Sequence, residues 1–167
     1  MGISGGAWWA VKIRQAWSYV RAHVRPAERE ALVAWTTPAQ RALFDAMHVA
    51  DRRHGLDVVA RLRIAGVSDP DALVAGLLHD AGKGEAGLAP RVVHAVGQAY
   101  GHWIWRLGGR LLRMRPTLAR LIDHAEGSAR LAAAAGCSTR TVELIRWQDS
   151  PQDPEFGEWL RLADEAG

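Results

Sequence analysis

The sequence predicts an all-α fold, a single helical bundle, on three observations. Apolar residues recur every three or four positions along most of the chain, which is the period of a helix with one buried face. No run of alternating β-branched residues bounded by turn pairs is present to form a strand. Capping residues, prolines and glycines mark helix starts and stops throughout. A chain of 167 residues suits one compact domain.

The first expected element is an amphipathic cover helix over residues 8–24, limited by Pro26, in an N-terminal region that comprises residues 1–36. The remainder, residues 37–167, is expected to form the main helical domain. It opens at Thr37-Pro38-Ala39-Gln40, which supplies an N-cap, a proline at the first helical position and a capping-box glutamine. Later helices are expected over residues 52–65, 68–82, 90–101, 103–115, 117–124, 128–135, 138–148 and 156–164.

Most of these later helices carry their own boundary signal. Gly66 closes one helix and Asp69-Pro70 opens the next. Pro90 opens the helix that follows a glycine-rich stretch, Gly136 stops an alanine-rich helix, and Ser138 caps its successor. A loop with two prolines then separates the last helix, whose apolar residues are spaced three or four apart.

Four side chains far apart in the sequence are expected to meet in this bundle. A short loop makes the third and fourth helices antiparallel neighbours, so His54 lies near His79 and Asp80. Asp164 continues the apolar stripe of the last helix and therefore faces inward, where a carboxylate needs a partner. Asp149, in the proline-flanked loop, is the alternative to Asp164. Imidazole and carboxylate ligands together suit divalent transition metals, whereas His79-Asp80 alone could simply cap a helix end.

Composition excludes several other classes of protein. Cys137 is the single cysteine, so an internal disulfide is impossible and a reducing, cytoplasmic setting is expected. The sequence has no apolar run of about 18 residues that would indicate a membrane span, and its start does not read as a signal peptide. The formal charge of +3 is too small to indicate a nucleic-acid partner.

The ordered set His54, His79-Asp80 and Asp164, in the segments HGLDVVARLRIAG, LLHDAGKG and LRLADEA, resembles the HD superfamily of metal-dependent phosphohydrolases over about residues 41–167. The resemblance implies an all-helical domain in which these four residues hold one divalent ion: Mn²⁺, Fe²⁺, Ni²⁺, Co²⁺, Zn²⁺ or Mg²⁺. It also implies that a metal-activated water cleaves a phosphate ester in a small phosphorylated substrate, expected to be a nucleotide.

The same resemblance suggests roles for three residues in catalysis. Asp80 would orient the attacking water in addition to ligating the metal. Lys83, one of only two lysines in the chain, stands where many relatives carry a lysine after the His-Asp pair, and it would stabilise phosphate oxygens. The segment that begins at His124 resembles the family's second-metal segment, so His124 is a candidate extra ligand or a candidate substrate contact; both alternatives stay open.

One departure from the family leaves the function open. Where HD-GYP relatives have paired histidines and a glycine-tyrosine-proline signature, this chain reads Arg146-Trp147-Gln148-Asp149-Ser150-Pro151. Tryptophan does not ligate metals and a neutral amide is a poor ligand, which argues against a complete two-metal site. The alternative function is therefore a catalytically weakened HD-type regulatory module that binds a metal or a nucleotide.

Tryptophans and arginines alternate over residues 103–115. In one interpretation the apolar residues close the bundle and the arginines are solvated. In another, Arg106, Arg110 or Arg113 binds substrate phosphates. In a third, the stripe and Trp8-Trp9 contact a membrane surface, which would make the chain a peripheral membrane protein. The sequence gives no expectation for the oligomeric state.

Overall fold

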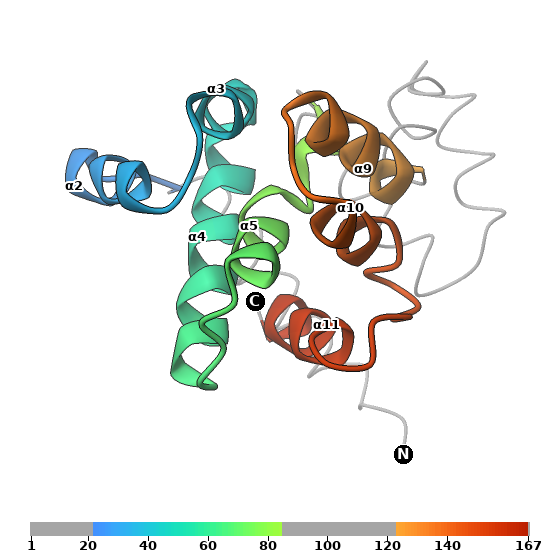
Figure 1. Cartoon of the computed structure of the whole chain (residues 1–167). Coiled ribbons are helices and arrows are strands. Elements are labelled where there is room, and N and C mark those ends of the chain that lie inside the picture. Colours follow the sequence, from blue (N-terminus) through green and yellow to red (C-terminus); the bar gives the residue numbers. More distant parts are fainter. Residues whose placement is uncertain (1–21, 85–122, 167) are drawn as a thin grey trace, which may run out of the picture.

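The computed structural model describes residues 22–84 and 123–166, and this part of the chain is built of α-helices and short 3₁₀ turns without any strand (Figure 1). The expected all-α class is thereby confirmed. The expected helices over 90–101 and 103–115, and most of those over 8–24 and 117–124, lie outside the described residues. The described elements are α2 (Pro26–Ala31), η1 (Leu32–Ala34), α3 (Pro38–Ala46), α4 (Val49–Ile64), α5 (Pro70–Leu78), η2 (Ala81–Lys83), α9 (His124–Ala134), α10 (Thr139–Arg146) and α11 (Gly157–Glu165).

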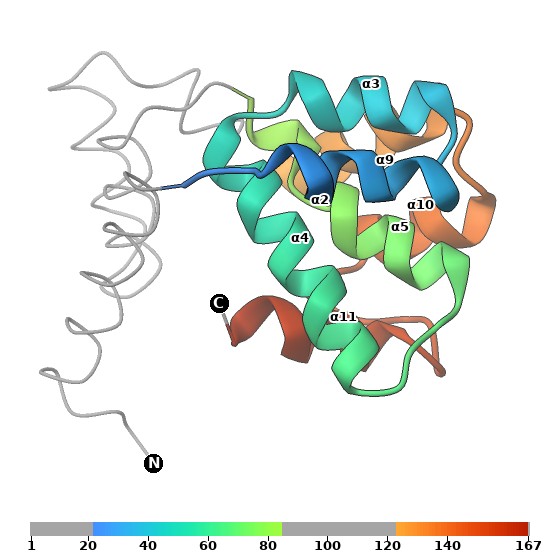
Figure 2. The same ribbon diagram turned by 90° about the vertical axis from the view of Figure 1, so that its left-hand side faces the viewer.

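Helix α5 lies at the centre of the described bundle. All its side chains from residue 72 to residue 78 are buried, as expected for a helix that is apolar all round. Helix α4 lies on one side of it and α10 on the other, and α11 contacts both α4 and α5 (Figures 1 and 2). Because α5 ends inside the bundle, the two residues that follow it, His79 and Asp80, are only 1% and 2% exposed.

Three of the expected helix starts are confirmed with their caps. At the start of α3, the Gln40 backbone N–H donates to Oγ1 of Thr37 at 3.2 Å, and the Gln40 side chain accepts from the Thr37 backbone N–H at 2.9 Å. At the start of α5, Asp69 accepts from the backbone N–H of Ala72 at 3.0 Å. At the start of α10, Ser138 accepts from a backbone N–H in the same way. Capping of this kind satisfies donors that a helix start leaves without a partner.

Other boundaries differ from the expectation. Pro26 occupies the first position of α2, where its missing N–H costs nothing, and most of the helix expected before it lies outside the described residues. Helix α4 starts at Val49 rather than near residue 52, because Nδ1 of His48 accepts from the backbone N–H of Ala50 at 3.2 Å and acts as an unexpected N-cap. Helix α9 starts at His124 rather than at Ser128.

Two glycines allow α4 to approach α5, and η2 to approach α9, more closely than any other residue would. A Cβ atom on Gly55 of α4 would lie 2.5 Å from the carbonyl oxygen of Leu77 in α5. A Cβ atom on Gly82 of η2 would lie 2.5 Å from both the carbonyl oxygen of His124 and the backbone nitrogen of Ser128 in α9. No real side chain tolerates such distances, so these contacts require glycine. The first contact holds α4 against α5, and the second holds η2, which follows α5, against the start of α9.

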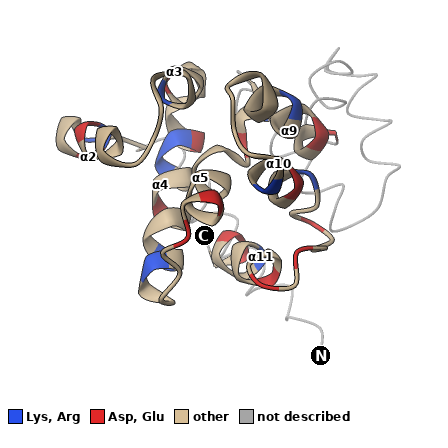
Figure 3. Cartoon of the chain, in the orientation of Figure 1, with Lys and Arg blue, Asp and Glu red and all other residues tan. Residues whose placement is uncertain are grey.

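Basic and acidic residues are mixed along α4, α9 and α10 rather than separated onto different helices (Figure 3). Ion pairs between neighbouring surface side chains are correspondingly common in the described part, as between Arg53 and Asp57 or between Arg146 and Glu126. Of the helices in the described part, none is long and apolar enough to cross a membrane.

Candidate metal centre

The structure brings the four expected metal ligands together from three helices. His54 comes from α4, His79 and Asp80 follow α5, and Asp164 belongs to α11. Nε2 of His54 lies 2.6 Å from Oδ1 of Asp164, and Nε2 of His79 lies 3.4 Å from the same oxygen. The two imidazole rings are 5.2 Å apart between centroids. One ligand atom each from His54, His79 and Asp164 lies within 4.8 Å of the others, a spacing that could hold a metal ion.

Asp80 joins this cluster through its neighbour, and Asp149 does not. Oδ1 of Asp80 lies 3.5 Å from Nε2 of His79. Asp149, the alternative to Asp164, is exposed after the end of α10. Asp164 reaches the cluster because Leu160 and Ala163 of the same helix are buried against the bundle, which turns that face of α11 inward.

A backbone contact orients the ring of His79. Its Nδ1 lies 3.0 Å from the carbonyl oxygen of Gly76, one turn earlier in the chain. Since a carbonyl oxygen can only accept, Nδ1 carries the proton in this hydrogen bond. Nε2 is therefore the atom that faces Asp80 and Asp164. Metal-ligating histidines are commonly held in this way, with one ring nitrogen donating to the backbone and the other directed to the metal.

Lys83 orients the carboxylate of Asp80. Its ammonium group donates to Oδ2 of Asp80 at 2.6 Å. The other carboxylate oxygen, Oδ1, lies 3.5 Å from Nε2 of His79. The lysine side chain is 23% exposed, whereas that of Asp80 is 2% exposed. In the described structure Lys83 thus pairs with the carboxylate of Asp80, and its contact with a substrate phosphate stays a prediction of the family resemblance.

Two buried polar atoms of the cluster, Nε2 of His79 and Oδ1 of Asp80, have no hydrogen-bond partner within the described part of the chain. Among the described side chains, four such atoms occur: Nε of Arg52, Nε2 of His79, Oδ1 of Asp80 and Oε1 of Gln148. An orphaned buried polar atom costs about 1–3 kcal/mol, so its presence calls for an explanation. A cation at the centre would give Nε2 of His79 and Oδ1 of Asp80 the partner that they lack. The donor set and these two atoms fit a divalent ion.

The electrostatics of the cluster favour positive charge at its centre. Burial acts to raise the pKa of Asp80, but the charges of His79 and Lys83 outweigh it and hold the pKa below its usual range. Burial likewise opposes ionisation of Asp164, and its hydrogen bond to His54 and its contact with His79 bring the pKa below the ordinary value. Both carboxylates are therefore ionised at neutral pH.

His79 responds to those two carboxylates. Burial acts to lower its pKa, but the charges of Asp80 and Asp164 outweigh burial and raise the pKa to about 9. A proton on His79 thus supplies part of the positive charge that the carboxylates attract. A divalent cation would meet the same demand with two charges, since metal ions displace protons from their ligands.

His124, the candidate extra ligand, lies at the edge of the cluster. It is the first residue of α9, and its Nε2 is 3.7 Å from Oδ1 of Asp80. The same ring nitrogen lies 3.1 Å from the side-chain nitrogen of Gln148, which follows α10. The group of side chains spaced to hold one ion consists of His54, His79 and Asp164.

Asp51 is a further buried carboxylate of this region, and no motif in the sequence pointed to it. It lies one turn before His54 on α4 and is 3% exposed. Burial acts to lower the pKa of Lys83, but Asp80 and, with a smaller effect, Asp51 outweigh burial and raise it. The signal in the sequence was its spacing of three residues from His54, which places both side chains on one side of a helix.

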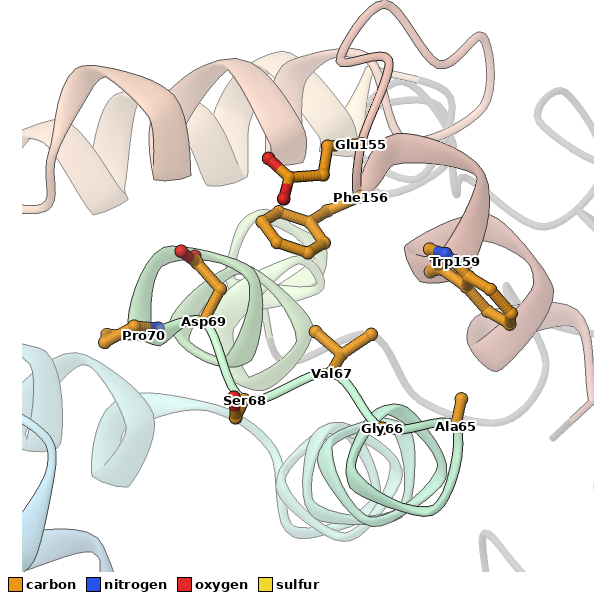
Figure 4. Close-up of a pocket in the computed structure, with 9 residues that line it drawn as sticks. All are labelled: Ala65, Gly66, Val67, Ser68, Asp69, Pro70, Glu155, Phe156 and Trp159. Carbon is orange, nitrogen blue, oxygen red and sulfur yellow. The ribbon is translucent and has the colours of Figure 1, made fainter.

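A separate groove of about 530 Å³ lies between the α4–α5 loop and the start of α11 (Figure 4). None of the clustered histidines or aspartates lines it. Its two carboxylates have partners within the protein: Asp69 caps α5, and Glu155 accepts a hydrogen bond from Arg140 at 2.8 Å. The groove therefore gives no argument for a charged ligand. Its lining residues are Ala65, Gly66, Val67, Ser68, Asp69, Pro70, Glu155, Phe156 and Trp159.

No protein-family model matches this chain, and neither the curated proteins nor the solved structures include a match to it. The resemblance to the HD superfamily rests on the residues quoted above. The structure shows a helical bundle with a cluster of two histidines and an aspartate that could hold a metal ion.

Proposed function

We propose that this chain is a metal-dependent phosphohydrolase of HD type that cleaves a phosphate ester, with a nucleotide as the expected substrate. The observation that carries the proposal is the convergence of His54, His79, Asp80 and Asp164 from separate helices, with two of their buried atoms lacking hydrogen-bond partners. The order of these residues in the sequence, which resembles the HD superfamily, supports the reaction class.

These four residues would hold the divalent cation. When bound, such a cation supplies the Lewis acidity that activates water and offsets the negative charge of a phosphate group. The chain's own residues prepare the site. Gly76 holds the ring of His79 with Nε2 directed into the cluster, and Lys83 holds Asp80 with Oδ1 directed the same way. The two ionised carboxylates attract the cation.

The proposal is tested with a panel of generic phosphomonoesters, phosphodiesters and nucleotides, assayed with Mn²⁺, Ni²⁺ and Mg²⁺. We expect metal-dependent hydrolysis by the wild type and only the background rate in Asp80→Asn. Asp149→Asn is the matched control, because it removes an exposed aspartate outside the cluster, and it should keep full activity. Absence of turnover with every metal would contradict the proposed hydrolase activity.

Metal content provides a second test that does not depend on the choice of substrate. Elemental analysis of the purified wild type should find a divalent transition metal. The His79→Ala variant should lose it, because Nε2 of His79 lies between Asp80 and Asp164. A metal-free wild type that takes up no added Mn²⁺ would contradict the proposed site.

A regulatory module that binds a metal or nucleotide without useful turnover is the second candidate. One observation favours it: the ammonium group of Lys83 is already paired with Asp80 at 2.6 Å, so its charge is not free for a phosphate. Tight metal binding without turnover on the whole panel would identify this alternative. The peripheral membrane alternative depends on Trp8, Trp9 and residues 103–115, which lie outside the described residues; co-sedimentation with anionic liposomes at low and moderate salt tests it.

A further inference from the structure

Gln148 is a buried residue whose side chain contacts the edge of the proposed metal site. It follows the last turn of α10 and is 4% exposed. Its side-chain nitrogen lies 3.1 Å from Nε2 of His124. An amide nitrogen can only donate a hydrogen bond, so Nε2 of His124 must accept it and carries no proton.

This hydrogen bond uses Nε2, the ring nitrogen of His124 that lies towards the proposed ligand set. Nε2 is the ring nitrogen that lies 3.7 Å from Oδ1 of Asp80. An unprotonated imidazole nitrogen has a single lone pair in the plane of the ring, and that lone pair cannot accept a hydrogen bond and bind a cation at the same time.

The burial of Gln148 makes this arrangement persistent. A glutamine at the surface would exchange its partner for water, whereas this side chain is enclosed and its Oε1 has no hydrogen-bond partner among the described residues. A buried amide that already has one unsatisfied atom would lose its remaining hydrogen bond at a cost of about 1–3 kcal/mol. The contact with His124 is therefore costly to break.

We propose that Gln148 is a positioning residue that holds His124 outside the metal's ligand set, so that the site takes one divalent cation and His124 remains a hydrogen-bonding group beside Asp80. This inference rests on the proposed function for the existence of the metal site. It adds which histidines contact the cation and how many ions are bound, and it resolves the two roles that the sequence leaves open for His124.

The experiment measures the ring nitrogens of the histidines by ¹⁵N NMR during a Zn²⁺ titration of the full chain. Signals are assigned with single histidine variants, and metal per chain is measured in parallel. In the metal-free wild type we expect Nε2 of His124 at the position of an unprotonated, hydrogen-bonded nitrogen. One equivalent of Zn²⁺ should shift Nε2 of His54 and His79, leave that of His124 in place, and saturate binding.

Two variants test the role of Gln148 itself. Gln148→Leu removes the donor, so Nε2 of His124 should lose its hydrogen-bonded signature and shift on metal addition. Gln148→Glu replaces the donor with an acceptor, so Nε2 of His124 should become protonated. If Gln148→Leu does not fold, the ¹⁵N signal of His124 in Gln148→Glu still tests the inference. Gln152→Leu, at an exposed glutamine, is the control and should match the wild type.

Several results would overturn the inference. They are a protonated Nε2 of His124 in the metal-free wild type, a shift of His124 together with His54 and His79 at the first equivalent, or His124 signals that are unchanged in both Gln148 variants. If none of the three histidines responds to Zn²⁺, the metal site itself is absent and the inference falls with it. That pattern differs from the others, so the two failures are distinguishable.

Discussion

Asp80 is a buried carboxylate whose negative charge is balanced locally by Lys83. The ion pair has one partner that is 2% exposed and another that is 23% exposed, so water screens it from one side only. Removing one partner from such a pair leaves the other as an uncompensated buried charge, which destabilises the fold more than the intact pair stabilises it. The lysine thus has a structural consequence in addition to its place in the site.

We expect Lys83→Met to lower the free energy of unfolding of the metal-free protein by roughly 2–3 kcal/mol, somewhat less than for a fully buried pair because Lys83 is partly exposed. Urea denaturation in the presence of a chelator measures this. Arg25→Met is the control, since Arg25 pairs with Glu28 at the surface and its side chain is 73% exposed. Equal stability of Lys83→Met and the wild type would contradict this account of Asp80.

At the scale of single residues, the sequence predicted that four side chains would lie close together, but it did not predict the contacts around them. His54, His79, Asp80 and Asp164 could be placed together because a short loop and one helical stripe determine where they lie. The contact between Gln148 and His124 could not be predicted in the same way. It depends on how α9 packs against α10, and spacing along the chain carries no information about that packing angle.

At the scale of elements, the contact between η2 and α9 depends on Gly82. This residue lies against the start of α9, and its backbone N–H donates to Oγ of the buried Ser128 at 2.7 Å. The contact fixes the distance between the segment that carries Asp80 and Lys83 and the helix that carries His124. A shift of η2 relative to α9 would therefore change the geometry of the candidate metal site even if none of the site's own residues were substituted.

We expect Gly82→Ala to destabilise the protein by about 1–3 kcal/mol through overpacking, because the added methyl group would meet the α9 backbone at 2.5 Å. It should also weaken Mn²⁺ binding, measured by calorimetry. Gly127→Ala is the matched control from the same contact: its Cβ would have no neighbour nearer than 3.6 Å, and alanine favours the helix by up to about 1 kcal/mol. If both variants behave alike in thermal unfolding, the close approach at Gly82 has no energetic role.

The helix boundaries show which signals the sequence carries and which it does not. The boxes and caps at Thr37, Asp69 and Ser138 involve side chains that commonly cap helices, and these starts were predicted. His48 is not a residue type that identifies an N-cap, so the first turn of α4 was missed. Pro26 is compatible both with the end of a preceding helix and with the start of a following one, and the structure has it at the first position of α2.

At the scale of the whole molecule, the cluster joins helices that are far apart in the chain. His54 and Asp164 are separated by 110 positions, yet their side chains lie 2.6 Å apart. A cation bound there would link α4, α5 and α11 in the folded state only, since the unfolded chain does not hold these groups together. Metal binding should therefore increase the free energy of unfolding.

We expect Mn²⁺ at about 100 times its Kd to raise the free energy of unfolding by about 2.7 kcal/mol, with a corresponding rise in Tm that a chelator reverses. Differential scanning calorimetry measures the effect. The His79→Ala variant should show no rise in Tm at the same Mn²⁺ concentration. A rise of equal size in that variant would mean that the metal stabilises the protein at some other place.

An ion pair outside the cluster also contributes to the response of stability to acid. Hydrogen bonds from Arg140 to Asp153 lower the pKa of that carboxyl to about 2, although partial burial opposes the shift. Because the folded pKa lies below the unfolded one, Asp153 contributes stability at neutral pH that is lost as the pH falls from about 4 through about 2.

We expect Asp153→Asn to be less stable than the wild type at pH 7, with a difference that shrinks as the pH approaches 2. Urea midpoints at intervals of pH measure this difference directly. Asp149→Asn, an exposed aspartate in the same loop, is the control, and its curve should run parallel to that of the wild type. A stability gap for Asp153→Asn that is constant with pH would contradict the assignment.

The position of Asp164 on α11 has a consequence for biosynthesis. Ribosomes deliver the chain from its N-terminus, and His54, His79 and Asp80 are all made long before residue 164. A nascent chain that stops before α11 would possess both imidazoles and the buried carboxylate, yet it would lack the carboxylate that lies 2.6 Å from His54. Only translation through α11 would therefore complete the proposed ligand set.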